Sequence, residues 1–397
     1  MTRQAVLSPG ITGDRRSAPP TGPYPADSVK KDLAELERIA AHIGRALSFM
    51  EVCGTHTMSA FRCGLAGVLP DNIRLISGPG CPVCVTSQAD IDQIIAAAHM
   101  PDVILCTYGD MLRVPGSRGS LESARMAGAD VRVVYSAMHA VTLAQSTTRQ
   151  VIFAAVGFET TAPATAAAVM AAKRLNLNNF SVLTSHKRII PAMRALLSSA
   201  PVDAPCVDGF LAPGHVSVII GTAAYLPIVR DFHKSCVIGG FEPPQIISAL
   251  TQLAQLAGEN KAELLNHYPE AVRPEGNLAA QQLLHTVFEP AAARWRGLGV
   301  IDQSGLILRM EYADFDARRR HQLCTPEDHE PRGCICGRVI SGAAAPGECP
   351  LFGSACTPVN PIGPCMVSSE GTCSAWFKYL PNHVRSNRGW SNQEVCT

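Results

Sequence analysis

VIFAAVGFETTAPATAAAVMAAKRL, at residues 151–175, is the stretch of sequence that decides the fold. Residues 151–156 form an uninterrupted apolar run with the length of a buried strand. A glycine turn follows at Gly157, and Thr161–Leu175 has the length and the composition of a helix. A strand, a tight turn and a helix in this order form the repeating unit of a parallel α/β sheet.

The same alternation continues on both sides of this unit. Further apolar runs predict strands at Ile73–Ile76, Val103–Thr107, Val131–Tyr135, Phe180–Thr184, Gly209–Ala212 and Cys236–Ile238. Helices are predicted at 28–48, Asp90–His99, Leu121–Ala127, Ile190–Ser199 and Pro244–Leu256. This pattern is typical of an α/β fold with parallel strands and right-handed crossovers.

Chain length and a break in the pattern near residue 145 predict several domains. The 397 residues are too many for one ordinary core. We expect a flexible extension over residues 1–27, and two small parallel-sheet α/β domains over 28–145 and 146–258. Residues 259–397 are expected to be helical over Glu263–Phe288 and then, from about residue 297, to form a loop-rich, cysteine-rich iron–sulfur domain.

The composition argues against several classes of function. A net charge of +1 and an aromatic content of 6% do not favour nucleic acid as a partner. No apolar run reaches the roughly 18 residues of a membrane span, so we expect no membrane segment. Fifteen cysteines without a secretory signal indicate a reducing cytoplasm, where cysteines bind metal or do redox chemistry more often than they form structural disulfides.

Glycine-containing loops that carry polar residues follow several predicted strands. The carboxyl ends of parallel strands gather at one edge of a sheet, so these loops can form a shared cleft. The polar side chains that we expect to take part in catalysis there are Asp110, Glu159, His215 and Glu242. For each loop taken alone, an ordinary turn with solvated or capping side chains is the alternative.

Cys81-Pro82-Val83-Cys84 is a C-x-x-C motif between a glycine turn and a predicted helix. A helix N-terminus stabilises a thiolate, which predicts a redox-active or nucleophilic dithiol. Upstream, Cys53 and His56 lie three residues apart, so that a thiolate and an imidazole can face one pocket and bind a transition metal such as iron. The alternatives are a zinc site shared by all four residues and, for Cys53, a buried small hydrophobic residue.

Seven cysteines fall between residues 324 and 373, in a segment rich in turn-forming residues. Such a segment buries little apolar surface and needs a metal to cross-link it. The irregular spacing of Cys336, Cys349, Cys356 and Cys373 favours a [4Fe–4S] cluster, whereas a structural zinc site usually shows two close pairs. Spacing leaves open which four of the seven bind, and no role is assigned to Cys63, Cys324, Cys334 and Cys365.

Eight motifs taken together resemble the HypD family of hydrogenase-formation proteins. They are MEVCGTHT (50–57), GPGCPVCV (78–85), GFETT (157–161), APGHVS (212–217), GFEP (240–243), WRGLG (295–299), CPLFG (349–353) and MVSSEG (366–371). The resemblance extends from about residue 45 to residue 380. It implies two α/β domains and a third domain with a [4Fe–4S] cluster.

The resemblance also implies a function, the maturation of [NiFe] hydrogenases. Together with a HypC-type partner, such a protein is a scaffold on which iron acquires two cyanides and one carbon monoxide, as Fe(CN)2CO, before transfer to the hydrogenase large subunit. Cyanide would come from a HypE-type partner that carries a thiocyanate. Cys53 matches the iron-binding cysteine and His56 a histidine near the iron, while Cys81 and Cys84 match a redox dithiol. The rival hypotheses are an iron–sulfur thiol–disulfide oxidoreductase acting on a protein disulfide and a zinc-stabilised interaction module.

Overall fold

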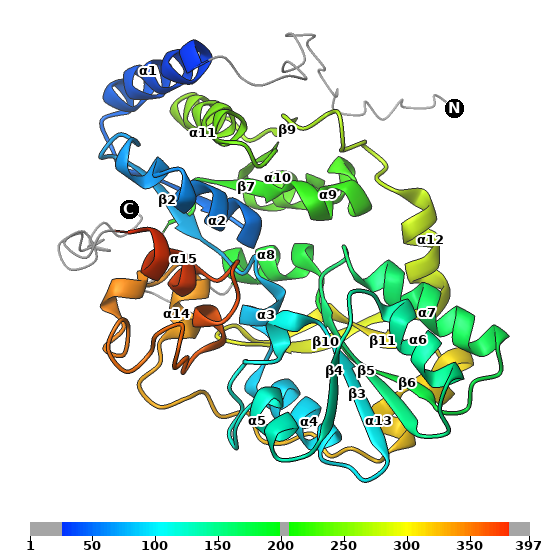
Figure 1. Cartoon of the computed structure of the whole chain (residues 1–397). Coiled ribbons are helices and arrows are strands. Elements are labelled where there is room, and N and C mark those ends of the chain that lie inside the picture. Colours follow the sequence, from blue (N-terminus) through cyan, green and yellow to red (C-terminus); the bar gives the residue numbers. More distant parts are fainter. Residues whose placement is uncertain (1–25, 199–205, 381–397) are drawn as a thin grey trace, which may run out of the picture.

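Two parallel β-sheets form the centre of the computed structural model, which describes residues 26–198 and 206–380 (Figure 1). The first, which we call the β1 sheet, has the strand order β2-β1-β7-β8-β9. Its strands are β1 (Leu47–Glu51), β2 (Ile73–Ser77), β7 (Gly209–Pro213), β8 (Ser235–Gly239) and β9 (Leu264–Asn266), and all neighbours are parallel.

The second sheet, which we call the β3 sheet, has the order β4-β3-β5-β6 and is also parallel. Its strands are β3 (Val103–Thr107), β4 (Asp130–Val133), β5 (Gln150–Gly157) and β6 (Phe180–His186). The α/β class with parallel sheets is therefore confirmed, and each of the seven predicted strands is present.

The expected boundary near residue 145 would place the two sheets one after the other along the chain. The structure does not have this arrangement. The β3 sheet is built from residues 103–186 and is inserted between β2 and β7 of the β1 sheet. Strand β5, placed by prediction in a second domain, pairs with β3 over Val103–Cys106. The prediction was wrong because a break in local pattern carries no information about which strands pair across long separations.

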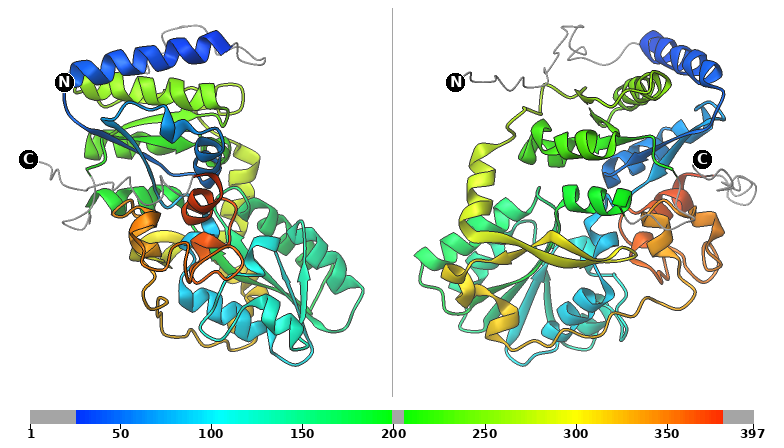
Figure 2. Two further views of the ribbon diagram at one scale, coloured as in Figure 1. Left: turned by 60° about the vertical axis from the view of Figure 1, so that its left-hand side comes forward. Right: turned by 180° about the vertical axis from the view of Figure 1, so that it is seen from behind.

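Helices cover both faces of each sheet (Figure 2). They are α1 (Ala26–Ile43), α2 (Gly54–Arg62), α3 (Pro82–Val85), α4 (Gln88–Ala98), α5 (Leu121–Met126), α6 (Ala137–Gln145), α7 (Ala162–Arg174), α8 (Ile189–Ser198), α9 (Gly214–Ile220), α10 (Leu226–Phe232), α11 (Pro243–Gly258), α12 (Leu278–Val287), α13 (Ala317–Arg320), α14 (Cys336–Ile340) and α15 (Thr372–Tyr379). On the β1 sheet, α11 packs on β7 and β8 and is itself covered by α1, while α9 and α10 also contact this sheet. On the β3 sheet, α6 and α7 contact β5 and β6, and α4 packs on β3.

One apolar core continues from the β1 sheet to the β3 sheet. It contains Phe210 and Ile238 of the first sheet together with Leu105 and Ile152 of the second, all fully buried. The buried Cys81 and Cys84 and most of the C-terminal cysteines belong to the same core. Burial of this apolar surface is what holds the sheets and the cysteine-rich region together.

An antiparallel hairpin, β10 (Phe288–Trp295) and β11 (Gly299–Leu308), leads to the C-terminal region. Strand β11 contacts α8 and β6, so the hairpin lies against the β3 sheet. Beyond it, the cysteine-rich segment consists of short helices and turns, and it contacts α2 through α15 and α3 through α14. In Figure 1 this segment, in orange and red, lies beside both sheets.

The structure corrects three local predictions. The helix expected over 28–48 ends at Ile43, and Gly44 adopts a positive φ of 68° that begins the turn into β1, a strand that was not predicted. The helix expected over Glu263–Phe288 is present only at α12, because prolines and glycine at 269–276 interrupt it. The region from residue 297 begins with a regular strand, β11.

Of the extension predicted at 1–27, residues 1–25 lie outside the described residues, and α1 begins at Ala26. Within the part of the chain that the structure describes, no helix combines the length and the apolar character that crossing a membrane requires.

Candidate functional site

Cys53 lies at the carboxyl end of β1, where the chain turns into α2. Its extended backbone (φ −148°, ψ 118°) makes it the N-cap of this helix, with the backbone N–H groups of Thr55 and His56 near its sulfur but no side-chain capping hydrogen bond. The side chain is buried, and burial, with the nearby charge of Glu370 as a further cause, raises the pKa of the Cys53 thiol to about 12. Cys53 is therefore held as a neutral thiol until a cation replaces its proton.

A buried carboxyl group, Glu51, fixes the backbone around Cys53. Its Oε2 accepts a hydrogen bond from the Cys53 backbone N–H at 3.0 Å, and its Oε1 accepts one from the Thr57 hydroxyl. Burial raises the pKa of Glu51 to about 8. Sequence reasoning assigned no role to Glu51, although an acidic residue at the end of an apolar run was the available signal.

The Cys53 loop and the C-x-x-C turn are in backbone contact. They follow the neighbouring strands β1 and β2, and the N–H of Gly54 donates to the carbonyl of Gly80 at 3.1 Å. A Cβ on Gly80 would clash with the backbone N of Cys53 and lie 2.5 Å from the carbonyl carbon of Val52. Only glycine allows this approach, which brings Cys81 next to the Cys53 loop.

His56 points away from solvent toward the loop that follows β8. Its Nε2 donates to the carbonyl of Gly240 at 3.0 Å, while no described residue is hydrogen-bonded to its Nδ1. Burial lowers the pKa of His56 to about 4, so the ring is neutral and Nδ1 presents a lone pair. The ring centroid lies 4.9 Å from that of Phe241, and the ring of the exposed His215 also stacks on Phe241, at 4.1 Å. Two predicted site residues, His56 and His215, thus contact the same ring.

The remaining predicted polar residues are spread over the molecule. Asp110 is exposed after β3 and accepts a hydrogen bond from the Ser368 hydroxyl at 3.2 Å. Glu242 is exposed at the N-terminus of α11. Glu159 is buried after β5, where its Oε1 accepts from the backbone N–H of Ile189 at the start of α8 (3.0 Å), and burial raises its pKa to about 7. None of these three contacts Cys53 within the described residues.

Cys81 and Cys84 are linked to the C-terminal cysteines through Cys365. Cys81 is the N-cap of α3, and its sulfur accepts from the backbone N–H of Cys84 at 3.3 Å. Burial and the neighbouring thiols of Cys365 and Cys81 raise the pKa of Cys84. The neighbouring thiols of Cys336, Cys373 and Cys84 lower the pKa of Cys365, so this residue, which had no predicted role, adjoins both thiol groups.

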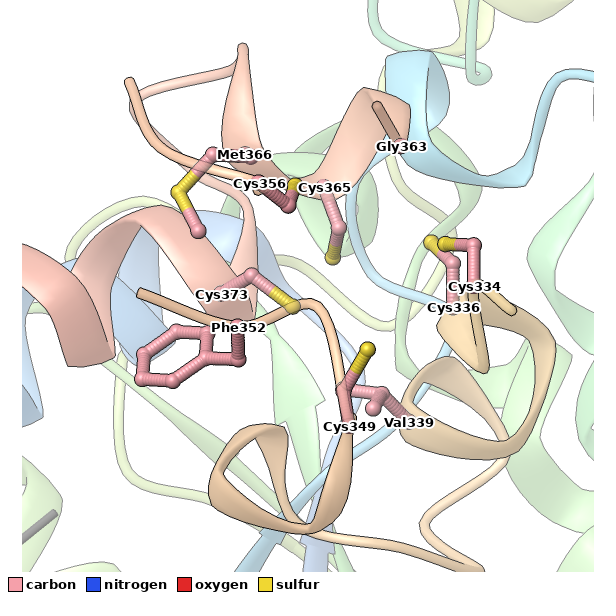
Figure 3. Close-up of a pocket in the computed structure, with 10 residues that line it drawn as sticks. All are labelled: Cys334, Cys336, Val339, Cys349, Phe352, Cys356, Gly363, Cys365, Met366 and Cys373. Carbon is pink, nitrogen blue, oxygen red and sulfur yellow. The ribbon is translucent and has the colours of Figure 1, made fainter. Parts of the chain in front are cut away.

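A pocket in the C-terminal region gathers six cysteines. Figure 3 shows their side chains around one space, and its lining consists of Cys334, Cys336, Val339, Cys349, Phe352, Cys356, Gly363, Cys365, Met366 and Cys373. All four predicted cluster cysteines are in this set, whereas Cys324 is exposed and does not line the pocket. The elements that position them are short: α14, α15 and the turns between them.

The pocket segment is also joined directly to the Cys53 loop. The Thr55 hydroxyl donates to Oε1 of Glu370 at 2.8 Å. Gly54 packs so closely on Glu370 that a Cβ there would clash with that side chain. Glu370 lies between Cys365 and Cys373 in the sequence, so one short segment connects the pocket to the candidate iron ligand.

This arrangement defines a class, namely an α/β protein with a buried thiol–imidazole site at a sheet edge, an adjoining dithiol and a cysteine-lined pocket. A family model, HypD, described as the hydrogenase formation hypA family, matches residues 27–380. The chain belongs to the HypD family.

Curated relatives agree over nearly their whole length. A hydrogenase maturation factor HypD of Azotobacter vinelandii is 46% identical over 360 residues, which cover 88% of this chain and 95% of the relative. The hydrogenase maturation factor HypD of Escherichia coli K12 is 44% identical over 361 residues, with coverage of 89% and 95%. A putative hydrogenase expression/formation protein of Methanocaldococcus jannaschii is 40% identical over 352 residues, with coverage of 88% and 97%.

Proposed function

We propose that this HypD-family protein is a hydrogenase maturation factor on which an iron ion receives two cyanides and one carbon monoxide. The observation that carries this proposal is the continuous series of thiol contacts from the cysteine pocket through Cys365 and Cys84 to Cys81, next to the Cys53 loop. Under this proposal, the metal ligand and the source of electrons would be neighbours.

Cys53 is the proposed protein ligand of the iron. A thiolate suits the soft, low-spin iron that cyanide and carbon monoxide favour, and binding releases the thiol proton. The backbone N–H groups at the start of α2 and the hydrogen bond from Cys53 to Glu51 hold the residue in place. His56 is neutral and offers the lone pair of Nδ1, which can bind the iron or accept a hydrogen bond.

The cysteine pocket fits a [4Fe–4S] cluster held by Cys336, Cys349, Cys356 and Cys373. Among the described residues, no group of three or more His, Cys, Asp or Glu side chains is arranged to hold a single metal ion. A cluster distributes its thiolates over four iron atoms, so its ligands lie farther apart than those of a zinc ion. The donor set therefore favours a cluster over the zinc alternative. When bound, such a cluster supplies single electrons.

Cys81 and Cys84 are the proposed reductant of a thiocyanate carried by a HypE-type partner. Overall, the S–C bond of the thiocyanate breaks and a Cys81–Cys84 disulfide forms. The two electrons from the thiols reduce the donor to a thiolate and cyanide, and two protons are released. To reduce the disulfide again, an external electron donor would have to supply two electrons, with uptake of two protons; Cys365 adjoins both Cys84 and the pocket cysteines. His215, exposed beside His56, is placed to accept a proton.

The proposed partners are a HypC-type protein that contributes a second thiolate, the HypE-type donor and, indirectly, the hydrogenase large subunit, all in the cytoplasm. The second candidate function is a thiol–disulfide oxidoreductase, which the Cys81–Cys84–Cys365 contacts would also serve. Cys81 and Cys84 are 5% and 1% exposed, so a disulfide on a folded protein cannot reach them without movement of α3. The same burial limits access for a thiocyanate carried by a HypE-type partner, so the two functions are separated by the infrared test below.

Infrared spectroscopy tests the proposal on protein purified anaerobically after co-expression with HypC- and HypE-type partners. Two cyanide bands and one carbon monoxide band are expected, lost in Cys53→Ala and kept in Cys63→Ala. Cys63 is an exposed cysteine at the other end of α2 and serves as the matched control. Bands that persist in Cys53→Ala would refute the role of Cys53. Silent spectra in a sample that retains the visible absorption of the cluster would favour the oxidoreductase.

A further inference from the structure

Arg296 is a fully buried cation that has no anionic partner among the described residues. It is 1% exposed and follows Trp295, the last residue of β10. Its Nε donates to the carbonyl of Thr86 and its Nη2 to Oε1 of Gln88, each at 3.1 Å, and both acceptors are neutral. Its Nη1 is buried without a hydrogen-bond partner, and no described carboxylate forms an ion pair with the guanidinium.

A buried guanidinium without a counter-charge is strongly unfavourable, since the charge has lost its water and gained nothing equivalent. Glu330 is an acidic residue placed close to this segment, but it accepts a hydrogen bond from the backbone N–H of Gly297 at 3.0 Å. The arrangement of Arg296 therefore calls for an anion that arrives from outside the polypeptide.

The contacts of Arg296 and its neighbour Gly297 indicate where that anion would bind. Its own N–H donates to the carbonyl of Val85 at 2.9 Å, and its side chain reaches Thr86, so it contacts the end of the helix that carries Cys81 and Cys84. On the other side, Gly297 packs on Gly337, the neighbour of Cys336: a Cβ on Gly297 would lie 2.7 Å from the Gly337 carbonyl oxygen.

The segment that carries Arg296 lies against the wall of the cysteine pocket. Gly337, on which Gly297 packs, directly follows Cys336 of the pocket lining. A cubane with four thiolates carries a net negative charge in both oxidation states, and reduction makes it more negative. Such a group would supply the anion that Arg296 lacks.

We propose that Arg296 is the counter-charge of the iron–sulfur cluster in the cysteine pocket and positions the dithiol helix against it. This inference rests on the cluster of the proposed function. Because the reduced cluster carries more negative charge than the oxidised one, a fixed cation stabilises the reduced form and raises the reduction potential. Arg296 is thus a positioning residue for electron transfer to the dithiol.

Four forms of the full-length protein test this role: the wild type, Arg296→Lys, Arg296→Met and Gln88→Met. Lysine keeps the charge, methionine keeps only a flexible chain, and Gln88→Met removes a hydrogen-bond partner of Arg296 while leaving its charge. Each is purified anaerobically, analysed for iron and acid-labile sulfide, and titrated by visible absorption to obtain the reduction potential of the cluster.

We expect Arg296→Met to lose much of the cluster or, where the cluster is retained, to shift its potential to more negative values. Arg296→Lys and Gln88→Met are expected to stay close to the wild type in both measurements. An unchanged potential and unchanged iron content in Arg296→Met would overturn the proposal. So would equal impairment of Arg296→Lys and Arg296→Met, which would assign a purely structural role. A wild type without iron and sulfide would instead refute the cluster of the proposed function.

Discussion

The Cys53 loop and the cysteine pocket are both sites of thiol chemistry, but the chain holds their sulfurs in different ways. Cys53 stands between a strand and a helix, and its backbone is fixed by Glu51 and by the close approach of Gly80. The pocket is made of short helices and turns, and the side-chain partners of Cys365 are other thiols.

The Cys53 loop is therefore ordered by the polypeptide itself, whereas the cysteine pocket would be completed by a bound metal. The geometry of the Cys53 loop follows from sheet and helix hydrogen bonds that exist without iron. The pocket segment is held by hydrogen bonds of turns and short helices rather than by a sheet, and a metal bound to its thiols would add a cross-link. Under the proposed function, the iron at Cys53 would be bound and released on an unchanged loop, whereas the cluster would stay and form part of the fold.

Removal of iron is expected to have the largest effect, and to act on one region only. After treatment with a chelator under reducing conditions, amide protection over residues 333–376 should fall to that of a frayed segment, because the cross-link is lost. Protection over residues 47–62 should change little. Hydrogen exchange followed by mass spectrometry measures both. Equal loss in the two segments would remove the distinction between them.

A pair of glycine substitutions compares the two regions directly. In Gly80→Ala the new Cβ clashes with the Cys53 backbone, and we expect a loss of about 3 kcal/mol in the free energy of unfolding. Gly353, in the pocket segment, has a φ of 72°, and no atom lies within 4 Å of the position that a Cβ would take, so Gly353→Ala should lose only about 1 kcal/mol. Denaturant unfolding gives both values. Similar losses would contradict the tighter packing at Cys53.

Glu159 provides a pH effect that should leave both thiol regions untouched. Its pKa is raised by burial from 4.5 to about 7, so the folded protein keeps the proton over a range where the unfolded chain releases it. The contribution of Glu159 to the free energy of unfolding is therefore fully present below pH 4.5. It falls by about 1.4 kcal/mol per pH unit as the pH rises toward 7. Glu159→Gln should remove the Glu159 part of this slope, while the part due to the buried Glu51 remains and the iron content stays constant. Unfolding curves at several pH values test it; an unchanged slope would contradict the assignment.

The hydrogen bond that joins the two regions should make the smallest contribution to the free energy of unfolding. Thr55→Val removes the hydrogen bond to Glu370 and should lower stability by about 1 kcal/mol. Amide exchange should rise near residue 370 and stay constant near Gly80, which contacts the Cys53 loop independently. Ser369→Ala, at an exposed neighbour, is the matched control. No change near residue 370 would mean that packing of Gly54, rather than this hydrogen bond, joins the regions.

Local patterns were sufficient to predict the strands, because each parallel strand here is a continuous apolar run. Strand β1 escaped prediction because Leu47 continues the helical periodicity of α1, and only the positive φ of Gly44 separates them. The insertion of one sheet into the other depends on pairing between residues far apart in the chain, such as Phe49 with Gly209, and no local pattern encodes it.

In the candidate site, too, some functional residues were predictable from the sequence and others were not. Cys53, His56, the dithiol and the pocket cysteines were predictable because their residue types and motifs carry the chemistry themselves. Other functional residues act through their hydrogen bonds and carry no motif. The partners of Glu370 and Arg296 come from distant segments, whereas those of Glu51 are its near neighbours Cys53 and Thr57. Cys365 was visible in the sequence, but its contact with Cys84 across 281 positions of the chain was not.

The insertion of the β3 sheet has a consequence for the order of events during synthesis. The carbonyl that fixes His56 belongs to Gly240, which is 184 residues later in the chain. Strands β3 to β6 can pair as soon as they leave the ribosome, whereas β1 and β2 must wait for β7 and β8 before the β1 sheet is complete. A nascent chain thus carries Cys53 and His56 long before their surroundings are complete, and, under the proposed function, only the finished polypeptide would capture iron.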